Sequence, residues 1–80
     1  MFYYMTKYSF DAHKVVTGPF ATEEEAWAAM EKDAFNELMI SKKESSANID
    51  YMVYEAEKEI VIVDHFKYYD HTTEWFVFQI

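Results

Sequence analysis

The residues best suited to chemistry are two Asp-His pairs, Asp64-His65 and Asp70-His71. Imidazole and carboxylate groups together are common ligands of divalent metals. Both pairs fall where strand ends and turns are expected, and polar residues collect there in any protein. Because adjacent residues on a strand point to opposite faces, Asp64 and His65 do not readily face one ion. The sequence therefore predicts no metal site and no cofactor.

Paired carboxylates are the second candidate, since such pairs act as general acid and base in hydrolases. Glu55, Glu57 and Glu59 are spaced in this way, but they lie at an expected hairpin tip, where a solvated charged turn is the simpler interpretation. The chain contains no G-x-S-x-G, P-loop, dinucleotide-binding or H-E-x-x-H motif. It has one glycine and no cysteine, which excludes a glycine-rich phosphate loop, thiol catalysis, disulfides and Cys-ligated metals. We expect that the protein is not an enzyme.

The charge balance restricts the partners. Seven Lys, no Arg and fifteen Asp and Glu give a net charge of −8 at pH 7. Aromatic residues form 20% of the chain, which invites comparison with the base-stacking platforms of nucleic-acid-binding proteins. Those platforms also need cations to hold the phosphates, and an acidic chain without arginine repels a polyanion. We therefore expect no direct binding of nucleic acid.

The acidic residues are concentrated in two segments, residues 21–37 with a net charge of −5 and residues 50–64 with −4. One interpretation is solubility for an aromatic-rich chain. The other is that rows of carboxylates imitate DNA phosphates, because residues three or four apart on a helix lie about 5–6 Å apart, close to the phosphate spacing. Such a surface would fill a basic groove on a protein partner. The candidate contacts are Glu24, Glu31, Glu55, Glu57 and Glu59.

The elements that position these residues begin with a strand over Phe2 to Phe10, where two sets of side chains alternate with a period of two. Val15 to Thr17 is a possible short returning strand. Gly18-Pro19 contains the only glycine and the only proline, and we expect it to break any regular element.

The most strongly marked element is a helix from about Glu23 to about Ser41. Thr22 and Glu25 have the spacing of a capping box at its start. One apolar stripe is expected to face the sheet, and a second lies about 100° further round, which is wider than the cover of one small sheet requires. The second stripe predicts a partner surface, and self-association by two-fold symmetry is the commonest way in which such a surface is covered. The first stripe contains Trp27, Met30, Ala34 and Leu38, and the second Ala28, Phe35 and Met39.

The last third of the chain has the pattern of three strands, Ile49 to Ala56, Ile60 to Tyr68 and Thr73 to Ile80. Short turns between them predict an antiparallel meander. The expected fold is a single α+β domain, residues 1–80, with a single helix packed on an antiparallel sheet of four to five strands in the order β(β)αβββ. No apolar run approaches the ~20 residues of a membrane span, and no signal peptide opens the chain, so we expect a soluble cytoplasmic protein.

The segment Val15-Val16-Thr17-Gly18-Pro19-Phe20, followed by Thr22-Glu23-Glu24-Glu25-Ala26, resembles the G-P-F and Glu-rich helix start of peptidoglycan-binding SPOR domains. The likeness covers under a fifth of the chain, and the repeated β-α-β arrangement of that family is missing. In size, charge and composition, the whole chain is similar to small, acidic, uncharacterised proteins of bacterial mobile elements. Some of those proteins are anti-CRISPR or anti-restriction inhibitors. The class has no shared motif and transfers no residues, but it favours mimicry.

The sequence thus predicts an acidic protein-interaction module. The first interpretation is an inhibitor that imitates nucleic-acid charge and occupies the basic groove of a nucleic-acid-handling partner. The alternative is a dimeric structural or regulatory module that uses the apolar helix face of Ala28, Phe35 and Met39.

Overall fold

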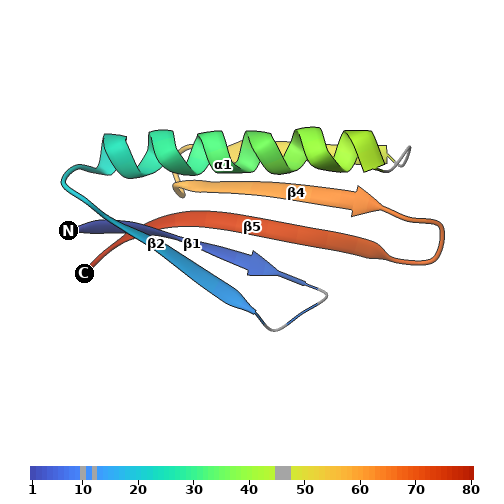
Figure 1. Ribbon diagram of the computed structural model, residues 1–80, viewed down its shortest axis with the longest axis horizontal. Coiled ribbons are helices and arrows are strands. Elements are labelled where there is room, and N and C mark those ends of the chain that lie inside the picture. Colours follow the sequence, from blue (N-terminus) through green and yellow to red (C-terminus); the bar gives the residue numbers. More distant parts are fainter. Residues whose placement is uncertain (10, 12, 45–47) are drawn as a thin grey trace.

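The protein is one helix packed on one face of a five-stranded antiparallel sheet, and the strand order is β2-β1-β5-β4-β3 (Figure 1). This computed structural model describes residues 1–9, 11, 13–44 and 48–80. It confirms the predicted α+β class and the position of the helix between two groups of strands. The elements are β1 (Phe2–Tyr8), β2 (Lys14–Phe20), α1 (Glu23–Glu44), β3 (Asn48–Tyr54), β4 (Glu59–His65) and β5 (Asp70–Gln79).

The centre of the sheet joins the two ends of the chain. β1 pairs with β5 from Phe2↔Gln79 to Tyr8↔Thr73, so the termini lie side by side (Figure 1). The Ile80 amide donates to the Met1 carbonyl at 3.1 Å. β3, β4 and β5 form the predicted antiparallel meander, which leaves β2 and β3 as the two edges of the sheet.

The prediction that Gly18-Pro19 would break regular structure was wrong, because both residues belong to β2. β2 is an edge strand, where proline is tolerated because one side of the strand needs no hydrogen-bond donors for the sheet. Its pairing with β1 is irregular between Phe2 and Tyr4. Gly18 has a φ of 145°, and a Cβ there would lie 2.8 Å from Cδ1 of Tyr3. Glycine therefore permits both the backbone conformation and the close approach to β1.

The predicted capping box is present at the start of α1. The Glu25 amide donates to Oγ1 of Thr22 at 3.2 Å, and the Ala21 amide donates to Oε2 of Glu25 at 3.3 Å. The helix continues to Glu44, a turn beyond its expected end at Ser41. Lys42 and Lys43 occupy its last turn, where cations interact favourably with the helix dipole. Phe10, the expected end of the first strand, lies outside the described residues.

The core lies between α1 and the sheet, and it contains the predicted first stripe of the helix. Met30 and Ala34 are fully buried, and Leu38 is 7% exposed. Trp27 is partly buried and packs against the same cluster. The strands contribute Tyr4, Ile60, Ile62 and Trp75, with Val77 at the margin. Cα register places these side chains on one face of the sheet.

The other face of the sheet is covered by no element of the part of the chain that the structure describes (Figure 1). It has aromatic character, because the rings of Tyr3 and Phe78 stack at 5.7 Å and those of Phe76 and Phe78 lie 6.0 Å apart. The Lys7 ammonium lies 5.1 Å from the centre of the Phe76 ring. Across the described ranges, the one helix falls short of the combined length and apolarity that crossing a bilayer requires.

Candidate functional site

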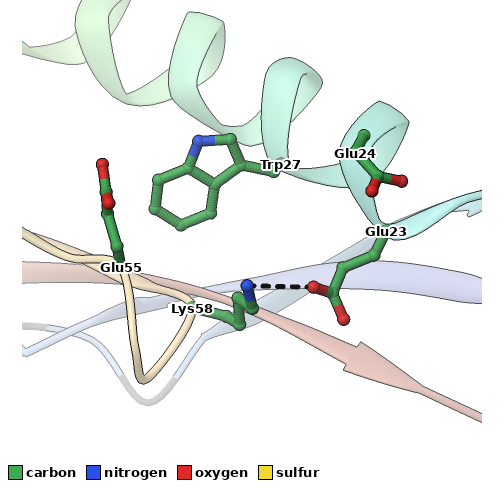
Figure 2. A pocket seen from close by; sticks show the side chains of 5 residues that line it. All are labelled: Glu23, Glu24, Trp27, Glu55 and Lys58. Atoms are coloured by element: carbon green, nitrogen blue, oxygen red, sulfur yellow. Dashed lines mark ion pairs between the residues drawn. The ribbon is translucent and has the colours of Figure 1, made fainter.

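The start of α1 and the turn between β3 and β4 meet at one end of the molecule. The turn is well held: Lys58 adopts a φ of 56°, its amide donates to the Glu55 carbonyl at 3.2 Å, and its carbonyl accepts from the Val77 amide at 3.0 Å. Between the turn and the helix lies an open pocket of about 270 Å³ (Figure 2). We call it the acidic pocket, and its lining residues are Glu23, Glu24, Trp27, Glu55 and Lys58.

The Trp27 indole forms the apolar wall of the acidic pocket. Figure 2 shows the ring between Glu55, on the turn, and the two glutamates at the helix start. The Lys58 ammonium pairs with Oε1 of Glu23 at 3.0 Å, and both side chains are nearly half exposed. Such a pair contributes little stability because water screens it. Glu24 and Glu55 form no salt bridge with any residue that the structure describes, so the pocket has an excess of negative charge.

This arrangement suits a cation with a flat or alkyl body. An ammonium or guanidinium group over an indole face is attracted by the ring, and nearby carboxylates accept charge-assisted hydrogen bonds from it. Arginine fits best, because its planar guanidinium stacks on aromatic rings and binds carboxylates with two parallel hydrogen bonds. The acidic pocket can therefore receive a basic side chain from another protein.

The five acidic residues that the sequence singled out do not form one continuous surface. Glu24 and Glu55 line the acidic pocket, and Glu57 is exposed on the same turn without lining it. Glu59 is opposite Phe76 in the pairing of β4 with β5, on the sheet face that the helix does not cover. Glu31 lies along α1 and borders a separate groove.

That groove separates α1 from the edge strand β3 and measures about 410 Å³. We call it the edge groove, and its lining residues are Ala28, Glu31, Lys32, Phe35, Tyr51 and Val53. Two members of the predicted second stripe, Ala28 and Phe35, thus lie together, and the Phe35 ring is 54% exposed. Met39, the third member, is 49% exposed but does not line the groove. Burial, with a smaller contribution from the Glu31 carboxylate, raises the pKa of Tyr51.

A third cluster centres on His65 at the end of β4. Its Nε2 lies 2.7 Å from Oδ2 of Asp50 on β3, and its Nδ1 lies 2.9 Å from Oδ1 of Asp70 on β5. The hydrogen bonds from His65 to Asp50 and then to Asp70 raise the pKa of the imidazole. Asp64, its neighbour in sequence, is on the other face of the sheet, as strand alternation requires. Among the described residues, no group of three or more His, Asp or Glu has a metal-binding arrangement.

Sequence reasoning missed three members of the acidic pocket, Glu23, Trp27 and Lys58. Trp27 was expected to face the sheet with the rest of its stripe, and it does contact the core. The position of Trp27 could have indicated that it also lines a pocket. It is the first residue of the stripe, about one turn after the helix cap. A ring as wide as indole at that place extends to the end of the sheet, where the turn between β3 and β4 lies.

Comparisons of the chain with protein-family models, with curated proteins and with solved structures gave no match.

Proposed function

We propose that the chain is an acidic protein-interaction module that occupies the basic groove of a nucleic-acid-handling protein and thereby inhibits it. One observation carries the proposal: two acidic segments that are distant in sequence converge around the exposed part of one indole ring. Solubility and the helix dipole account for acids at the helix start, but neither requires a second acidic segment beside the same ring. The acidic pocket provides the ring and the carboxylates that a basic side chain requires.

Binding would begin with an arginine or lysine of the partner entering the acidic pocket. The Trp27 indole attracts such a cation by about 0.5–2 kcal/mol, depending on how much water is displaced. Glu24 and Glu55 then accept hydrogen bonds from it, while Lys58 keeps Glu23 in place. The exposed acids Glu31 and Glu57 extend the negative surface along the helix and the turn. A groove that normally holds phosphates offers several cations at comparable spacing.

The net charge of −8 gives the encounter a long-range component. Opposite charges on the two surfaces accelerate association, and salt screens that attraction over about 8 Å at physiological ionic strength. We expect the association rate to fall as salt is raised, while the dissociation rate changes less. Nucleic acid added in excess should compete with the protein for the partner.

The chain offers an intrinsic probe for the first step. Trp75 is fully buried, so a change of tryptophan fluorescence on adding a short arginine-rich peptide reports on Trp27. We expect a saturable change of fluorescence, and its absence in Trp27→Phe would assign the signal to Trp27. The double variant Glu24→Gln/Glu55→Gln should bind at least about tenfold more weakly, since each lost charge-assisted hydrogen bond costs more than a neutral one.

The matched control is Glu31→Gln/Glu57→Gln, which removes the same net charge outside the acidic pocket. It should alter the affinity by no more than about threefold, because its carboxylates act only through screened, longer-range attraction. An equal loss in both double variants would contradict the proposed pocket. Retention of a basic, nucleic-acid-handling protein from bacterial lysate by the wild type, but not by Glu24→Gln/Glu55→Gln, would extend the result to the partner.

A second candidate function, that of a dimeric module, is supported by the exposed apolar face of α1. Phe35, Met39 and Ile40 on α1 are each about half exposed, which is unusual for neighbouring large apolar side chains on the only helix of the described chain. A dimeric structural or regulatory module would cover them. Phe35→Lys should then dissociate the dimer and leave the melting temperature of the monomer nearly unchanged, because the ring does not belong to the core.

A further inference from the structure

The two edges of the sheet differ in how they are protected against pairing with another strand. β2 contains Lys14, Gly18 and Pro19, and its register with β1 is irregular, all of which are natural defences of an edge. β3 has none of these features. It pairs with β4 without interruption from Asn48 to Tyr54, and its only charged residue is Asp50. β3 therefore presents a regular row of backbone donors and acceptors.

The surface beside this open edge is apolar and locally neutral. Phe35 is 54% exposed and Val53 41% exposed, and both line the edge groove. The groove contains one carboxylate, Glu31, and one ammonium, Lys32, whereas the chain as a whole has a charge of −8. The edge groove therefore has no net charge, and Asp50, the one acid on β3 itself, is paired with His65. Two copies can meet at this edge with less repulsion than elsewhere on the acidic surface.

We propose that β3 pairs with β3 of a second copy of this chain, antiparallel across a two-fold axis at Tyr51, and forms one continuous sheet. The proposal specifies the partner in the second of the functions above, and it is independent of the acidic pocket. The two-fold axis places both helices on the same side of the joined sheet. The two edge grooves then merge into one apolar layer that covers Phe35 and Val53 of both copies.

The register follows from the strand itself. In an antiparallel pair, residues directly opposite each other point to the same face, so Tyr51 meets Tyr51 and Ile49 meets Val53 on the helix side. On the other side, Asp50 meets Met52. This register uses all seven residues of β3, since Tyr51 is its central residue. An axis at Asp50 would place two carboxylates opposite each other, and an axis at Met52 would leave Asn48 and Ile49 unpaired.

Disulfide trapping tests the axis directly, because the chain has no cysteine. In Tyr51→Cys, the two introduced thiols lie across the axis at about 4.5–5.5 Å between Cα atoms, within the range of a disulfide. In the control Val53→Cys, they lie four residues out of register, roughly 13 Å apart. Under mild oxidation of folded protein, we expect at least about tenfold more covalent dimer from Tyr51→Cys.

Charge at position 52 gives a second measurement that does not depend on the tyrosine. Met52→Asp places a carboxylate opposite Asp50 twice in the dimer, whereas Met52→Lys places an ammonium there. Light scattering should show a dimer for the wild type and for Met52→Lys, and the 9.6 kDa monomer for Met52→Asp. A monomeric wild type at high concentration would overturn both the inference and the dimeric function. A wild-type dimer that Tyr51→Cys does not trap and Phe35→Lys dissociates would overturn the strand pairing alone.

Discussion

His65 is held by two acids from the strands on either side of its own. An imidazole can donate from both ring nitrogens only when it is protonated, so the bridge to Asp50 and Asp70 requires the charged form. The hydrogen bonds to Asp50 and Asp70 accordingly raise the pKa of His65 above its ordinary value. The stabilisation is complete below that ordinary pKa of about 6.5 and is lost as the pH rises through the raised value.

We therefore expect the wild type to lose thermal stability, relative to the variant His65→Gln, as the pH rises above the ordinary pKa of about 6.5. The pKa of His65, followed by NMR, should lie above 6.5, the ordinary value for histidine. Asp50→Asn should lower this pKa, because it removes the largest of the interactions that raise it. A His65 pKa at or below the ordinary value would contradict the bridge.

The sequence allowed the separation of Asp64 from His65 to be predicted, but neither of the two contacts of His65. Alternation along a strand separates Asp64 from His65, and the structure places them on opposite faces. The true partners come from β3 and β5, whose identity depends on strand order and register. Asp70 is directly opposite His65 in that register, whereas Asp50 is a diagonal neighbour. No periodicity within a single strand contains that information.

The two apolar stripes of the helix differ in exposure, and two adjacent residues show this most clearly. Leu38 is 7% exposed in the core, and Met39 is 49% exposed. Leu38→Ala should lower the free energy of unfolding by roughly 2–5 kcal/mol, through lost burial and the cavity left behind. Met39→Ala is the matched control and should change it by less than about 0.5 kcal/mol in the monomer. Chemical denaturation measures both, and equal losses would show that the stripes are misassigned.

Gly18 of β2 should tolerate no larger side chain. In Gly18→Ala, the new methyl group meets Cδ1 of Tyr3 at 2.8 Å and the Phe2 carbonyl oxygen at 3.1 Å, at a φ of 145°. We expect the free energy of unfolding to fall by about 1–3 kcal/mol, because backbone strain and the close contact act together. Val16→Ala on the same strand is the control, because Val16 is 52% exposed and its loss should cost little. A melting temperature for Gly18→Ala equal to that of Val16→Ala would contradict this account.

Capping residues and hydrophobic periodicity predicted the helix and most of the strands well. They did not predict the place of each strand in the sheet. The capping box fixed the start of α1, and the spacing of its first stripe identified the buried face. β2 was predicted as three residues because Gly18-Pro19 looks like a terminator. Its seven residues become possible once the strand is an edge, which is a property of the sheet and not of the segment.

Over the whole molecule, the two acidic segments could be predicted, but their meeting at one end could not. The segments of Glu24 and Glu55 approach because α1 begins beside the turn between β3 and β4. That proximity follows from the path of the helix across the sheet. It also has an electrostatic consequence, because like charges gathered at one end repel each other and oppose folding. The acidity proposed for binding therefore lowers the stability of the free protein.

Neutralising the acidic pocket measures this conflict between binding and stability. Glu24→Gln/Glu55→Gln should weaken binding of the arginine-rich peptide and yet raise the melting temperature by about 2–5 °C at low salt, where relief of repulsion is largest. The gain should shrink as salt rises, because added ions already screen the repulsion in the wild type. Glu74→Gln is the control for simple loss of negative charge: Glu74 is opposite Lys7 in the sheet, so its removal should lower the melting temperature. If both variants shift it in the same direction, net charge alone explains the effect.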